Sequence, residues 1–174
     1  MPMPTESTKL LSMTRLVPVV GIALILVATA SAAKITRSTT TATYKLTLSV
    51  GPKEPMYTAA EVKAKNLTSG EVMIDDGMSM DGMSMGAGNR HLELQIKSRA
   101  TNKVLPLMPT ITLIDTNAMS GMAMTDKLHV MAMYGIEEGR SDLHYGNNVK
   151  LTAGHMYKVV ATVKGEKASF TFRA

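Results

Sequence analysis

The chain has 174 residues, no cysteine and a formal net charge of +5. The lack of cysteine excludes cysteine-ligated zinc, iron–sulfur clusters, thiolate-ligated copper and cysteine nucleophiles. The charges are scattered without a basic tract, so nucleic-acid binding is not expected. The unusual feature is methionine, with sixteen residues against two phenylalanines, five tyrosines and no tryptophan.

The N-terminus has the pattern of an export signal. Lys9 and Arg15 precede an apolar run over residues 16–30, and the small residues Ala30-Ser31-Ala32-Ala33 at its end fit a cleavage site. We expect residues 1–33 to be a hydrophobic helix that enters the membrane, as a cleaved signal peptide or as a retained N-terminal anchor. The rest of the chain is then exported, to the periplasm, the cell surface or the medium.

The remaining sequence predicts strands. A polar segment over residues 34–42 is expected to be a tether, and apolar and polar residues then alternate from Tyr44 to Val50. Thr58 and Glu61 have the spacing of a capping box, which predicts a short helix or turn, with an irregular edge strand as the alternative. Further strands are predicted at residues 71–74, 91–96, 110–116, 128–134, 149–151 and 157–172, the last with a tight hairpin turn at Gly165-Glu166.

These short strands, separated by turn signals and with no long helix, predict one all-β domain over residues 43–174. Their number indicates a β-sandwich of about seven to nine strands, preceded by the N-terminal hydrophobic helix.

Two predicted loops, residues 75–89 and 117–126, are rich in methionine. Their methionines are Met78, Met80, Met83 and Met85 in the first loop and Met119, Met122 and Met124 in the second. A thioether is an uncharged, polarisable donor that suits copper(I) and needs no deprotonation. Metal ligation is therefore the preferred interpretation. A hydrophobic docking surface and an incidental or oxidant-scavenging role are the alternatives.

Histidines and other methionines on predicted strands form a second group of candidate ligands. Strand alternation gives two sets that each share one face, and one histidine follows in a separate segment: His91 with Glu93, then His129 with Met131 and Met133, and finally His144. If these faces meet, one pocket contains imidazoles, a carboxylate and a thioether, a mixture that suits copper in both oxidation states or Fe²⁺. The alternative is a set of unrelated surface histidines.

Several of these segments resemble the periplasmic Fe²⁺ transport protein family over roughly residues 89–164. The segments are His91-Leu92-Glu93, the methionine-bearing strand, His144-Tyr145-Gly146-Asn147-Asn148-Val149 and Gly154-x-x-Tyr157-x-Val159. The resemblance implies an immunoglobulin-like sandwich that binds copper or iron, with homodimers in some members and an inner-membrane iron permease as partner. It assigns His91 and His144 as imidazole ligands, Glu93 as the carboxylate, and Met133 or Met131 as the thioether.

This sequence departs from the family in its methionine-rich loops and in the longer spacing between the strand methionines and His144. The additional thioethers favour copper as the ion, with Fe²⁺ as the second candidate. The expected function is extracytoplasmic binding of this ion for uptake, delivery or resistance. No catalytic triad, phosphate loop or redox thiol is present, so an enzyme is not expected. The competing hypothesis is a membrane-tethered, immunoglobulin-like interaction module with no metal role.

Overall fold

Strands with alternating buried and exposed side chains build two sheets in the computed structural model, which describes residues 33–74, 88–117 and 124–174. The described residues belong to one unit, Ser31–Ala174. The prediction of an all-β sandwich is confirmed, with eleven strands in the described ranges instead of seven to nine. The expected N-terminal helix lies outside those ranges.

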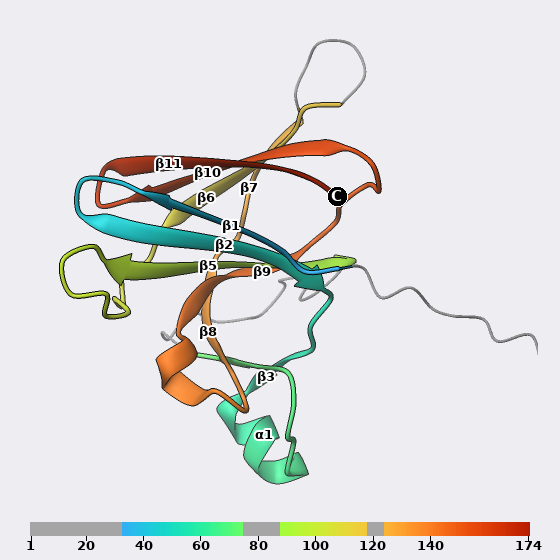
Figure 1. Cartoon of the computed structure of the whole chain (residues 1–174). Coiled ribbons are helices and arrows are strands. Elements are labelled where there is room, and N and C mark those ends of the chain that lie inside the picture. The colour runs from blue at the N-terminus through green and yellow to red at the C-terminus, as the bar shows by residue number, and fades with distance from the viewer. Residues whose placement is uncertain (1–32, 75–87, 118–123) are drawn as a thin grey trace, which may run out of the picture. The chain divides into compact units, whose positions relative to one another are not determined.

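The larger sheet has seven strands and the smaller one has four. The larger sheet runs in the order β1 (Ile35–Thr40), β2 (Tyr44–Pro52), β5 (Arg90–Ser98), β9 (His144–Val149), β8 (Met131–Gly135), β4 (Glu71–Met73) and β3 (Met56–Thr58). The smaller sheet runs in the order β11 (Glu166–Arg173), β10 (Met156–Val163), β6 (Thr110–Asp115) and β7 (Met124–Lys127). Figure 1 shows the two sheets as layers, with β10 and β11 drawn above β2 and β5. All neighbouring strands are antiparallel except β3 and β4, which are parallel.

The polar segment that was expected to be a tether is a strand over most of its length. Residues Ile35–Thr40 form β1, which pairs with β2 along its whole length. The segment is rich in threonine, a β-branched residue that favours extended backbone even when the side chain is exposed. Ser38 and Thr47 also pair their hydroxyl groups across the two strands at 3.0 Å. An edge strand of this kind needs little apolar surface, which is why hydrophobic alternation did not reveal it.

The short helix α1 confirms the capping box. It spans Ala59–Lys65, and the Thr58 side chain accepts a hydrogen bond from the Glu61 backbone N–H while the Glu61 carboxylate accepts one from the Thr58 backbone N–H. Asn66 ends the helix in the left-handed conformation. Across the described ranges, no helix has the length and apolar character needed to cross a membrane.

The C-terminal hairpin is also confirmed, with its turn one residue earlier than predicted. β10 and β11 pair up to Val163 and Glu166, so Lys164 and Gly165 form a two-residue turn. Both residues have positive φ, at 46° and 86°. Positive φ at both turn residues is the backbone conformation that matches the twist of a two-residue antiparallel hairpin.

The core lies between the two sheets. Apolar side chains of both sheets are buried there, including Leu46, Leu94, Val159 and Phe172. Strand alternation directs the intervening side chains of β5, β9, β8 and β4 to the other face of the larger sheet. This second face carries His91, Met133, His144 and Glu71, and all four side chains are nevertheless buried. We call it the outer face.

Gly146, in the centre of β9, marks a close approach of two strands. A Cβ atom added there would lie 1.7 Å from the Leu92 carbonyl oxygen on β5. Because backbone cannot move aside as a side-chain tip can, we expect Gly146→Ala to destabilise the fold by about 1–3 kcal/mol.

Gly51 is the matched control for this substitution. It is also a strand glycine of the larger sheet, but a Cβ atom added to it would meet no other atom within 4 Å. Urea unfolding would compare the two variants. Gly51→Ala should be neutral or slightly stabilising. Equal unfolding midpoints for both variants would contradict the close approach.

Candidate metal site

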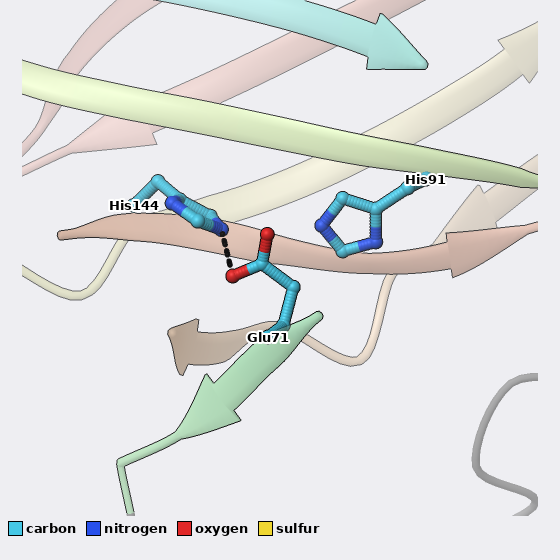
Figure 2. Close-up of side chains that lie close together, drawn as sticks. All are labelled: Glu71, His91 and His144. Atoms are coloured by element: carbon cyan, nitrogen blue, oxygen red, sulfur yellow. Dashed lines mark ion pairs between the residues drawn. The ribbon is translucent and has the colours of Figure 1, made fainter. Parts of the chain in front are cut away.

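Three ionisable side chains of the outer face converge on one buried point. Glu71 comes from β4, His91 from β5 and His144 from β9, and Figure 2 shows the Glu71 carboxylate between the two imidazole rings. Their exposed fractions are 7%, 0% and 2%. One ligand atom from each lies within 4.8 Å of the other two. The two rings meet edge to face, with centroids 6.0 Å apart.

The strand order explains this convergence. β9 lies between β5 and β8, and β8 pairs on its other side with β4. In the β8–β9 register His144 lies opposite Met133, and in the β4–β8 register Met133 lies opposite Met73. Directly opposite residues share a face of the sheet, and Glu71 shares that face with Met73 by alternation. Segments far apart in sequence thus place their polar side chains on one surface.

His144 directs its Nε2 atom into the cluster. Its Nδ1 atom lies 2.7 Å from the Asp142 backbone carbonyl oxygen. A carbonyl oxygen only accepts, so Nδ1 carries a hydrogen and donates it. Nε2 lies 3.3 Å from the Glu71 carboxylate, which is ion-pair distance when the ring is protonated, but the alignment is not that of a hydrogen bond. Burial lowers the pKa of His144, but its contacts with Asp142 and Glu71 outweigh burial and raise this pKa to about 10.

His91 presents the same ring nitrogen from the opposite side. Its Nδ1 atom lies 3.0 Å from the side-chain oxygen of Asn148, and its Nε2 atom is buried without a hydrogen-bond partner. Burial lowers the pKa of His91, so the ring is neutral near pH 7. The cluster therefore contains a neutral imidazole, a readily protonated imidazole and a carboxylate.

The ligand atoms of the cluster lack the partners that buried polar atoms normally have. Glu71 Oε2, His91 Nε2 and His144 Nε2 are each buried with no hydrogen bond. Glu71 Oε2 and His144 Nε2 face each other at 3.3 Å as an ion pair without a hydrogen bond, whereas His91 Nε2 has no partner. An unsatisfied buried polar atom costs about 1–3 kcal/mol, so this arrangement calls for an explanation. A cation explains all three at once. Two imidazole nitrogens and one carboxylate oxygen are a donor set that suits copper, iron(II) and zinc.

Two predicted thioether ligands lie on the same face as this cluster. Met133 is fully buried and lies directly opposite His144. Met131 is partly buried and lies opposite Gly146, which in turn lies opposite Glu93. Of these two methionines, Met133 is therefore the one directly opposite His144 on the neighbouring strand.

Glu93 and His129, which the sequence also suggested, lie elsewhere. Glu93 shares the outer face and is partly exposed, and Lys34 Nζ lies 3.3 Å from its carboxylate. The carboxylate within the three-residue cluster is Glu71. A strand was predicted over residues 128–134, but β8 begins only at Met131. His129 thus lies in the connection before β8, where it is exposed. It therefore does not share a strand face with Met131 and Met133.

Sequence reasoning missed Glu71 and the strand that carries His144. Glu71 was inside a predicted short strand, where alternation with Met73 was the available signal. β9 was missed because Gly146 and two asparagines interrupt its apolar pattern.

Most of the methionine-rich loops fall outside the described ranges. This applies to Met78, Met80, Met83, Met85, Met119 and Met122, while Met124 is the first residue of β7.

Comparisons with known proteins find similarity among solved structures. No protein-family model matches the chain, and no curated protein sequence matches it. The chain is similar to a solved structure of a copper-bound variant of FetP from uropathogenic Escherichia coli. The two are 18% identical, the match covers 81% of this chain and 97% of that one, and the TM-score is 0.48.

Proposed function

We propose that this protein binds a copper ion through His91, His144 and Glu71, with Fe²⁺ as the second candidate ion. The observation that carries the proposal is the set of three buried ligand atoms within 4.8 Å of one another, none of which has a hydrogen-bond partner. A bound cation would give His91 Nε2 the partner that it lacks and would replace the contact between Glu71 and His144, which is not a hydrogen bond.

The donor types favour copper. Imidazole nitrogen is a good ligand for copper in both oxidation states, and a carboxylate supports copper(II). The adjacent Met133 offers a thioether, which supports copper(I). The same two histidines and carboxylate would suit Fe²⁺, which explains its place as the second candidate.

The position of Glu71 is consistent with a site that exchanges its ion. Glu71 belongs to β4, a strand of only three residues, whereas His91 lies in a nine-residue strand. A three-residue strand has few ladder hydrogen bonds, and segments held by few contacts open locally at a lower free-energy cost. Opening of β4 would remove the carboxylate and expose the ion while the two histidines remain on their strands.

The proposal includes a place of action outside the cytoplasm. It rests on the export pattern of residues 1–33. There the protein would serve metal uptake, delivery or resistance, beside a membrane metal permease and as a monomer or a homodimer.

A competition titration tests the proposal. The protein is titrated with copper(I) against a chromophoric chelator, and with copper(II) and Fe²⁺ separately. A variant lacking residues 78–85 is measured in parallel. We expect the wild type to retain copper, and its melting temperature to rise because an ion at a hundred times Kd stabilises the native state by about 2.7 kcal/mol.

Equal affinity in the deletion variant would exclude the methionines of residues 78–85 as ligands, and reduced affinity would add them to the ligands. A wild-type protein that holds neither copper nor iron after dialysis, with an unchanged melting temperature, would overturn the proposal.

A further inference from the structure

Asn148 connects the cluster of Glu71, His91 and His144 to the chain segment between β2 and β3. Its amide nitrogen lies 2.7 Å from the Glu54 carbonyl oxygen, and its amide oxygen lies 3.3 Å from the Glu54 backbone nitrogen. The same amide oxygen lies 3.0 Å from His91 Nδ1. Asn148 is 9% exposed, so these contacts take place within the protein.

The two contacts with Glu54 fix the orientation of the Asn148 amide. A backbone carbonyl oxygen only accepts hydrogen bonds, so it must face the amide nitrogen. A backbone N–H only donates, so it must face the amide oxygen. Exchanging the two ends of the amide would break both contacts, and the oxygen therefore faces His91.

This orientation decides which nitrogen of His91 carries the hydrogen. The amide oxygen of Asn148 has no hydrogen to donate, so Nδ1 of His91 must donate to it. In the neutral ring the other nitrogen, Nε2, then has a free lone pair, and Nε2 is the atom that lies in the cluster with Glu71 and His144.

We infer that Asn148 is a positioning residue that fixes the tautomer and the ring orientation of His91, so that the ring offers the Nε2 lone pair to the ion. This inference rests on the proposed function. His144 Nδ1 faces a backbone carbonyl oxygen, which no substitution removes, and also lies 3.3 Å from the Asp142 carboxylate. His91 depends on a side chain, and for this reason the inference is open to test by mutation.

Asn89 provides a matched control. Its amide nitrogen lies 2.8 Å from the Leu151 carbonyl oxygen, and its amide oxygen accepts a hydrogen bond from the Leu151 backbone N–H at 2.8 Å. Asn89→Leu and Asn148→Leu therefore each remove two side-chain contacts with the backbone of one distant residue. Only Asn148→Leu also removes the acceptor for His91.

The variants are compared by copper titration and by nitrogen-15 spectra of the histidine rings in the metal-free protein, with the His91 signals identified by their loss in His91→Gln. We expect the Nδ1–H form in the wild type and in Asn89→Leu. Asn148→Leu should populate the Nε2–H form and bind copper about 10–100-fold more weakly, as is typical when a group that orients a ligand is removed. Asn148→Asp keeps an acceptor and should keep the wild-type tautomer.

Two results would overturn the inference. One is an Nε2–H form of His91 in the metal-free wild type, which needs no variant to observe. The other is equal copper affinity in Asn148→Leu and Asn89→Leu. A wild type that binds neither copper nor iron would end the proposed function instead, and the spectra of the metal-free protein would still decide the role of Asn148.

Discussion

Replacement of Glu71 and His144 together by leucine is expected to abolish metal binding while leaving the metal-free protein at least as stable as the wild type. The two side chains form a buried pair whose facing atoms, 3.3 Å apart, have no hydrogen bond. Taking both charges out of water costs several kcal/mol, and an apolar pair of similar volume is often neutral or stabilising by about 1–4 kcal/mol. The substitution also removes two of the three proposed ligands.

The single substitution His144→Leu should behave differently. It leaves the Glu71 carboxylate buried without its partner, and breaking a buried pair in this way typically costs about 3–5 kcal/mol. Urea unfolding of the wild type, Glu71→Leu, His144→Leu and the double variant completes a double-mutant cycle. Dialysis against copper gives the metal content of each protein.

His155→Leu is the control for the loss of a histidine that contacts an acid, because His155 Nδ1 lies 2.8 Å from Asp115 in the smaller sheet and outside the cluster. It should bind copper like the wild type. A double variant that still binds copper, or one that is less stable than His144→Leu, would contradict the cluster as we describe it.

Metal affinity is expected to rise with pH by about tenfold per pH unit from near 7 to near 9. In the metal-free protein the pKa of His144 is raised from 6.5 to about 10, so over this range the ring carries a proton. An ion at Nε2 must displace this proton, and each ion bound therefore releases about one proton. His91 contributes none, because its pKa is lowered and its ring is already neutral.

The raised pKa of His144 also makes the stability of the metal-free protein depend on pH. The folded-state pKa of His144 lies above its ordinary value, so the folded state binds the proton more tightly than the unfolded state does. The resulting stabilisation is complete below about pH 6.5 and is lost as the pH rises through about 10. The metal-free protein should thus lose stability toward alkaline pH, in the range where its affinity for metal increases.

Chelator competition at several pH values, corrected for protonation of the chelator, measures this dependence. Glu71→Gln removes one of the groups that raise the pKa of His144, so in this variant the rise in affinity should level off at lower pH. An affinity that does not change between about pH 7 and 9 would show that no proton is displaced from His144.

Local features of the chain were predictable because they depend on residues close in sequence. Alternation at Tyr44 to Val50 determines a strand, since each apolar side chain must face the same core. Thr58 and Glu61 determine the start of α1, because their side chains satisfy each other's backbone N–H groups. The residue pattern offered His91, His129 and His144 as imidazole ligands of one pocket, and the family resemblance narrowed them to His91 and His144, which do lie in one cluster.

Other features were decided only by strand order and register. The sequence by itself determined an all-β domain and three candidate histidines. It did not determine that β4 would lie beside β8, because a three-residue strand carries too little pattern to specify its neighbours. Only that pairing brings Glu71 to the histidines. The tertiary structure therefore decided which carboxylate belongs to the cluster, since sheet pairing joins distant segments through backbone hydrogen bonds that any sequence can form.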